Sequence, residues 1–76
     1  MDYNTKNIGL RIKSRAKEKK IKLKEMLHEC GLGINTISRV TNGSDIQAIN
    51  LAKIADALDC SVDYLLGRTD NPESHK

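Results

Sequence analysis

The chain has 76 residues, 38% of them hydrophobic and 30% charged, which fits one small globular domain and leaves no room for separate substrate and cofactor lobes. Trp and Phe are absent and Pro occurs once, which favours an all-α fold with a small aliphatic core that would gain from self-association. The net charge is only +3, but nine of the 13 basic residues precede residue 25, at positions 6, 11, 13, 15, 17, 19, 20, 22 and 24. This cationic region could bind phosphate groups or simply be a solvated surface.

The first predicted helix covers about residues 6–20 and carries most of these cations. Its apolar residues recur every four positions as a narrow seam, at Ile8, Ile12 and Ala16. Thr5 or Asn7 would cap its start. The seam would pack under the following helices, and the cationic side would face phosphate groups. An anionic membrane is a poorer partner, because the seam is narrow and lacks large aromatic residues.

A shorter helix is predicted over residues 23–30, after a tight connection at Ile21 and Lys22. Its apolar residues are three and four positions apart on one face, at Met26, Leu27 and Cys30. Gly31 then supplies the left-handed backbone conformation that ends a helix without Cβ strain. The N–H groups in the first turn of this helix, beside Lys22 and Lys24, form a candidate phosphate site.

The next helix is predicted over residues 34–41, and Asn42-Gly43 ends it. Its inward side comprises Thr36, Ile37 and Val40. Its other side carries small and hydrogen-bonding side chains, at Asn35, Ser38, Arg39 and Asn42, with Ile34 at the edge. Two short helices joined through a glycine in this way predict a helix-turn-helix, whose second helix reads the major groove of DNA.

Two further helices are predicted, over about residues 46–58 and residues 62–66. The core face of the first has the i, i+3, i+4, i+7 pattern, at Leu51, Ile54, Ala55 and Leu58. Ser44 or Asp45 would cap the first of these helices, and Ser61 would cap the second.

The chain thus divides into three predicted parts: a flexible N-terminus over residues 1–7, a helix-turn-helix DNA-binding domain over residues 8–67 and a polar tail over residues 68–76. Cys30 and Cys60 both lie in helix-like contexts, which favours free thiols in a cytoplasmic protein over a disulfide framework. We recognise no secretory signal and no membrane span.

Enzymatic and metal-binding functions have little support in this sequence. His28 and Cys30 diverge on one helix and His75 lies in the tail, so these residues would not converge with Cys60 on a zinc ion. We recognise no Ser–His–acid grouping and no glycine-rich phosphate loop. We therefore expect no catalysis, no cofactor and no small-molecule substrate.

Together these elements resemble the XRE family of helix-turn-helix regulators, the DNA-binding domains of lambdoid phage repressor and Cro type, from about Ile8 to Leu66. Three blocks carry the resemblance: Ile8-Gly9 with Arg11-Ile12; the spacing of Met26, Cys30, Gly31, Leu32, Ile37 and Val40; and Leu51–Leu58 followed by Ser61–Gly67. Asn42-Gly43 also lies where the family closes its recognition helix. The resemblance implies five helices, a homodimer, a palindromic operator and transcriptional control.

The chain departs from the family pattern in its second helix. The family usually has Ser or Thr and then Gln, which grips a phosphate, where this chain has Lys22 and Leu23. Leu23 cannot make that contact, so Lys22 or Lys24 would take it over. Leu27 replaces the usual small Ala, which would splay the crossing of the second and third helices slightly.

The resemblance places the base-reading positions at Gly33, Ile34, Asn35, Ser38 and Arg39. Arg39 has the forked donors that match guanine O6 and N7, and a phosphate contact or a surface ion pair is the alternative. Asn35 fits adenine N6 and N7, or a phosphate. Ile34 would touch a thymine methyl group or pack on Ile37. Ser38 is small enough for close approach, and Gly33 suits the turn better than the bases.

Two further surfaces are predicted. Phosphates would be bound by side chains and backbone N–H groups of Lys22, Lys24, Asn42, Gly43 and Ser44. Dimer contacts would come from the loop before the helix over residues 46–58 and from the end of the last helix, at Tyr64, Leu65, Gly67 and Arg68.

We therefore expect an all-α, compact five-helix domain that binds double-stranded DNA as a homodimer, with half-sites about one helical turn apart. It would act as a repressor of phage or mobile-element type by occluding polymerase. The alternative is an antitoxin that binds a toxin and represses its own operon. Residues 68–76 are short and polar for a toxin-binding segment, which weighs against this alternative.

Overall fold

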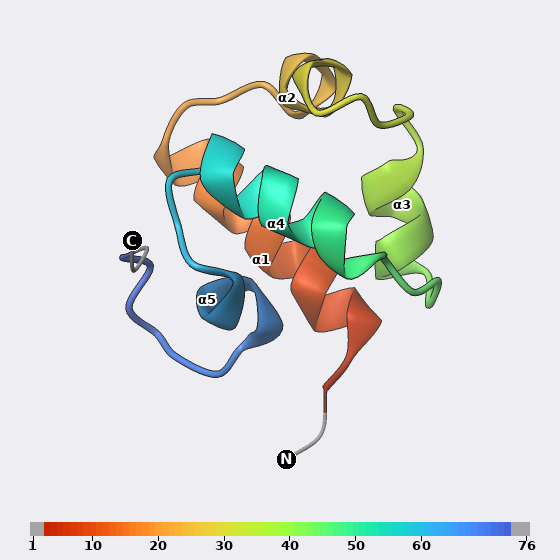
Figure 1. Ribbon diagram of the computed structural model, residues 1–76. Helices are drawn as coiled ribbons and strands as arrows, with labels where there is room; N and C mark the ends of the chain where they lie inside the picture. Colours follow the sequence, from red (N-terminus) through yellow and green to blue (C-terminus); the bar gives the residue numbers. More distant parts are fainter. Residues whose placement is uncertain (1–2, 74–76) are drawn as a thin grey trace.

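The computed structural model describes residues 3–73, and this part of the chain contains helices and turns but no strand (Figure 1). Five helices follow one another: α1 (Thr5–Glu18), α2 (Leu23–Glu29), α3 (Thr36–Thr41), α4 (Ala48–Ala57) and α5 (Val62–Leu66). The predicted all-α fold around a central helix-turn-helix, formed by α2 and α3, is confirmed.

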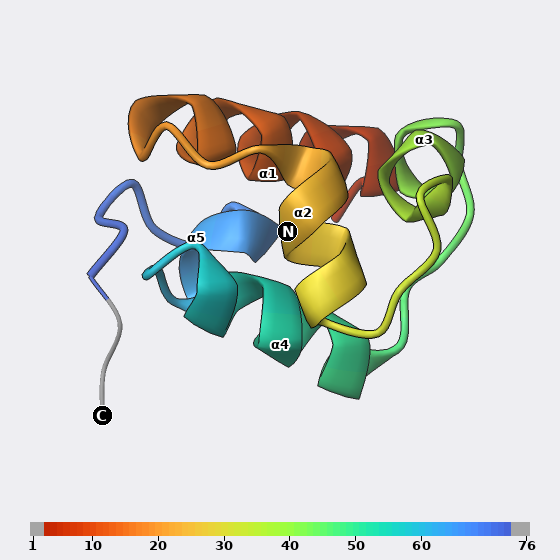
Figure 2. The same cartoon turned by 90° about the horizontal axis from the view of Figure 1, so that it is seen from above.

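The core lies between α1 and α4, which run along opposite sides of the molecule (Figure 2). α2 lies across one side of this pair, α5 packs against both helices, and α3 lies against the N-terminal end of α1. The core side chains are at most 5% exposed, and the largest of those under 2% exposed include Ile12, Met26, Ile54, Leu58 and Leu65. The apolar patterns predicted for α1 and α4 are therefore confirmed as the faces that enter the core.

Both ends of α1 differ from the prediction. The N-terminal cap is Asn4 rather than Thr5 or Asn7, because the Asn4 Oδ1 accepts hydrogen bonds from the backbone N–H groups of residues 6 and 7 at 2.8 and 3.3 Å. The helix begins at Thr5, one residue before the predicted start at about residue 6. The helix ends at Glu18 rather than residue 20, because Lys20 adopts a left-handed conformation with φ of 57°.

The start of α4 also differs. The helix begins at Ala48 rather than residue 46, because Gln47 is extended, with ψ of 142°. Neither Ser44 nor Asp45 caps it: Gln47 is the cap residue and makes no side-chain cap hydrogen bond, while the Asp45 carboxylate accepts from the N–H of the next residue. The Ser61 cap predicted for α5 is confirmed, since its hydroxyl accepts a hydrogen bond from an N–H of the first turn. At the other end, Gly67 ends the helix with φ of 85°.

The described part of the tail folds back on the domain. The carbonyl of Pro72 accepts a hydrogen bond from the N–H of Ser61 at 3.0 Å, and Asp70 pairs with Arg11 at 3.6 Å. Cys30 and Cys60 are both free thiols, and burial raises the pKa of each.

Candidate nucleic-acid interface

The turn between α2 and α3 contains a glycine in the left-handed backbone conformation, as predicted. Gly31 has φ of 74°, which a residue with a side chain rarely adopts. The chain then reverses, so that the N–H of Leu32 donates to the carbonyl of Leu27 at 2.8 Å and the Leu32 side chain packs on the core. This local hydrogen bond and apolar contact fix where α2 ends and where the next segment starts.

The recognition helix starts later than predicted. Gly33 offers a carbonyl that accepts from both the N–H and the hydroxyl of Thr36, at 3.1 and 2.7 Å. Ile34 and Asn35 therefore lie in a turn that leads into α3, which is regular only from Thr36. The predicted range of 34–41 was two residues too long at its start.

The two sides of α3 separate as predicted. Ile37 and Val40 are 3% and 2% exposed and enter the core, whereas Ser38 and Arg39 are exposed. Asn35 is exposed as well, as the residue that precedes the helix. Within residues 3–73, the Arg39 side chain makes no ion pair and no hydrogen bond, so its donors are available to a ligand.

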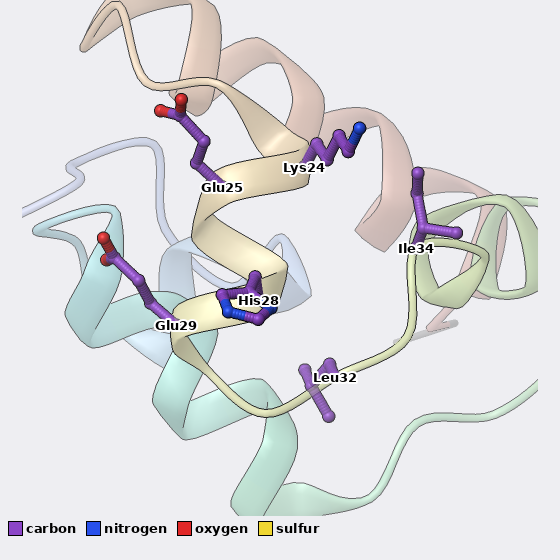
Figure 3. Close-up of a pocket in the computed structure, with 6 residues that line it drawn as sticks. All are labelled: Lys24, Glu25, His28, Glu29, Leu32 and Ile34. Carbon is purple, nitrogen blue, oxygen red and sulfur yellow. The ribbon is translucent and has the colours of Figure 1, made fainter.

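Ile34 lies on the surface, beside a groove between α2 and the turn. Its side chain is 63% exposed, so it does not pack into the core with Ile37. Six residues line the groove: Lys24, Glu25, His28, Glu29, Leu32 and Ile34 (Figure 3). In this view Lys24 extends toward the segment that carries Ile34, while Glu25 and Glu29 point to the opposite side of α2. α2 therefore presents a cation beside the turn and its carboxylates away from it.

The start of α2 is free of side-chain capping. Lys22 is the cap residue and forms no side-chain cap hydrogen bond, and both Lys22 and Lys24 are exposed. The first N–H groups of a helix have no intrahelical acceptor, so this end can bind an anion through its backbone and two lysines.

We predicted a second phosphate site at the backbone N–H groups that follow α3, and this prediction is wrong. The N–H groups of Asn42, Gly43 and Ser44 donate to the carbonyls of residues 38, 40 and 39, at 3.0, 3.1 and 2.9 Å. These bonds close the end of α3, so the three N–H groups are not free. The Asn42 and Ser44 side chains are exposed and remain candidates.

The cations of α1 divide between two sides of the helix. Arg11, Arg15 and Lys19 face the α4–α5 connection and the tail, where they bind carbonyl groups and carboxylates. Three exposed lysines fall instead on the side of Gly9, which packs against α3: Lys6, Lys13 and Lys17. The exposed lysines of α1 therefore lie on the side of the helix that meets α3, while Arg11 and Arg15 contact other parts of the domain.

The predicted dimer residues do not all reach the surface. Leu65 is fully buried in the core of its own chain, so its assignment to a dimer interface is wrong. Tyr64 is half-buried, with the Arg11 guanidinium 5.3 Å from the centre of its ring. Gly67 and Arg68 are exposed, and Arg68 pairs with Asp63 at 3.5 Å.

The most exposed large apolar residue within residues 3–73 was not predicted from the sequence pattern. Ile49, in the first turn of α4, is 69% exposed. It lies on the opposite side of the helix from the core residue Leu51, two positions away. An isoleucine out of phase with the apolar pattern was the signal that could have identified it.

Nothing in residues 3–73 indicates a metal site: this part of the chain has no group of three or more His, Cys, Asp or Glu side chains placed to bind one ion. His75 lies outside the described residues. None of the helices in the described range has the length and apolarity needed to cross a bilayer.

Residues 11–71 match the family model of the Cro/C1-type helix-turn-helix DNA-binding domain. The match covers most of the chain and includes both helices of the helix-turn-helix, so the chain belongs to this family of DNA-binding regulators. The resemblance to XRE regulators is thereby confirmed. Comparisons with curated proteins and with solved structures give no match.

Proposed function

From this family membership we propose that the chain is a sequence-specific transcriptional repressor that inserts α3 into the major groove of double-stranded DNA. The observation that carries the proposal is the exposed side of α3, where Arg39 stands beside Ser38 with its donors unoccupied by other described residues. Arg39 would read a guanine, Asn35 an adenine, and Ile34 a thymine methyl group.

The lysines around α3 support binding of the flanking phosphates. Lys22 and Lys24 stand at the start of α2, and the lysine side of α1 continues the cationic surface. Such contacts carry no sequence information, but they fix the position and orientation of the protein on the duplex. The side chains of Asn42 and Ser44 are proposed to add contacts at the other end of α3.

We further propose that the protein acts as a homodimer on a palindromic operator and represses by occluding polymerase. Each domain presents a single six-residue reading helix with few base-reading side chains, so a second copy would double the base contacts. The exposed Ile49 next to the loop before α4 is consistent with a surface that a second copy covers.

The test is binding of a fluorescent duplex of arbitrary sequence across a salt series, followed by selection of preferred sites from a random pool. Affinity should fall steeply with salt, and the slope counts the phosphates bound. Arg39→Ala should relax the preference at one base position, at a cost of about 1–3 kcal/mol on the selected site. Absence of binding even at low salt would overturn the proposal and favour a protein partner, to be sought by copurification.

A further inference from the structure

The position of α3 depends mainly on α1. Among the described helices, α1 is the one to which the backbone of α3 comes closest, whereas α2, its partner in the helix-turn-helix, approaches it less. Figure 2 shows α3 at the N-terminal end of α1, beyond the body of the other helices. The orientation of the reading helix is therefore set where it crosses α1.

Gly9 lies at this crossing and is buried. A Cβ atom at position 9 would overlap the Oγ1 of Thr41 and lie 3.1 Å from its Cβ and 3.2 Å from its Cα. Carbon atoms in favourable contact stay about 3.5–4.0 Å apart, so the added atom would displace the backbone of α3. The Thr41 hydroxyl is also held in place, because it donates a 2.8 Å hydrogen bond to the carbonyl of Ile37.

We propose that Gly9 is a positioning residue for DNA reading: its lack of a side chain sets how closely the C-terminal end of α3 approaches α1. The inference rests on the proposed function. Because α3 has only six residues, moving its end at Thr41 tilts Asn35 and Arg39 relative to the lysines on the rest of the domain. Flexible lysines follow a phosphate through such a tilt, whereas bidentate base contacts do not.

The first measurement compares the DNA affinity of Gly9→Ala with that of the wild type on two duplexes. One duplex is a sequence that the wild type enriches from a random pool, and the other is a scrambled version of it. We expect affinity for the enriched duplex to fall about tenfold or more. Affinity for the scrambled duplex should change by less than about twofold, since the phosphate contacts remain. Alanine favours helix over glycine, so α1 itself is not weakened by the substitution.

A matched pair of second substitutions tests the contact itself. In the Gly9→Ala background, Thr41→Ala removes the overlapping hydroxyl and leaves only the 3.1 and 3.2 Å carbon contacts, so it should restore part of both the thermal stability and the affinity for the enriched duplex. Thr41→Val removes the same hydrogen bond but keeps a branched side chain in that space, and it should restore neither. The comparison works even if Gly9→Ala alone folds poorly, because only relief of the contact then restores folding.

The position of α3 can also be followed without DNA, from the backbone amide chemical shifts of residues 36–41. These shifts should move in Gly9→Ala and return part of the way in Gly9→Ala/Thr41→Ala, but not in Gly9→Ala/Thr41→Val. Wild-type affinity of Gly9→Ala for the enriched duplex, or equal behaviour of the two double variants, would overturn the inference. If the wild type enriches no sequence, the proposed function fails, and the amide shifts still decide whether Gly9 positions α3.

Discussion

Two arginines of α1 bind backbone carbonyl groups at the ends of other helices. Arg15 donates from Nε to the carbonyl of Leu58 at 3.1 Å and from Nη2 to that of Asp59 at 2.8 Å. Arg11, one turn earlier, donates to the carbonyl of Tyr64 at 3.2 Å. The last carbonyls of a helix lack intrahelical donors and favour a nearby positive charge. Arg11 and Arg15 therefore act as C-terminal caps of α5 and α4 that are supplied by α1.

Arg15→Lys should lower the free energy of unfolding by about 1–2 kcal/mol, although it keeps the charge, because an ammonium group cannot reproduce the planar fork that reaches two carbonyls. Urea denaturation followed by circular dichroism measures the loss. The matched control is Lys13→Met, at an exposed position of the same helix, which should change the free energy by less than about 0.5 kcal/mol. Equal effects of the two substitutions would contradict the capping role of Arg15.

At the scale of the elements, apolar periodicity located α1 to α4, because each buries a face that the chain marks with Ile, Leu, Val, Ala or Met, whereas α5 was predicted from its Ser61 cap. The helix ends were less predictable. Lys20 and Asp59 adopt left-handed conformations, with φ of 57° and 53°, after the ends of α1 and α4. Neither residue is a glycine, so the sequence gives no signal for these helix ends. They adopt this conformation because the residues that follow, Ile21 and Cys60, then turn onto the core.

The candidate site was also predictable only in part. The outward side of α3 followed from its period alone, because Ile37 and Val40 had to be buried. The roles of Arg11 and Arg15 did not follow, because their carbonyl partners lie 53 and 43 positions away in the sequence. The local sequence pattern predicts which side of a helix is polar, but not which of its polar side chains will hydrogen-bond to a distant element.

The short helix α5 illustrates how much an element can depend on one cap. Its five residues hold Leu65 in the core, and the Ser61 hydroxyl accepts from the N–H of Tyr64 at 3.0 Å. So short a helix has little stability of its own. Ser61→Ala should therefore destabilise the domain by about 1 kcal/mol, measured as a shift of the urea midpoint.

The control for the cap is Ser14→Ala, in the exposed middle of α1, where alanine is the better helix former and no loss is expected. A loss from Ser14→Ala as large as that from Ser61→Ala would show that the hydroxyl at position 61 has no capping effect.

For the whole molecule, the pairing of charges matters more than the net charge of +3. Arg11, Arg15 and Lys19 are matched by Asp70, Glu18 and Asp59 in ion pairs of 3.5–3.7 Å. The lysines of the Gly9 side of α1 and of the start of α2 form no ion pair within residues 3–73. In the proposed DNA-binding role, these lysines would steer the domain toward DNA.

The proposed homodimer should depend on Ile49, the 69% exposed isoleucine in the first turn of α4. If Ile49 lies in the proposed interface, Ile49→Gln removes apolar surface from both copies, so the dimer should weaken about tenfold or more. Sedimentation equilibrium measures this loss directly. On DNA, affinity for a duplex with two half-sites should fall, while affinity for a single half-site should stay unchanged, because α3 is untouched.

Leu10→Gln is the matched control for Ile49→Gln. Leu10 is also an exposed apolar residue, at 46%, but it lies on α1 rather than on α4. It should leave both the sedimentation behaviour and the preference for two half-sites unchanged. Equal losses from the two substitutions would mean that general surface polarity, rather than a contact at Ile49, controls association. A wild-type chain that sediments as a monomer and binds two half-sites independently would exclude the dimer itself, and the base contacts of a single α3 would then have to supply all of the specificity.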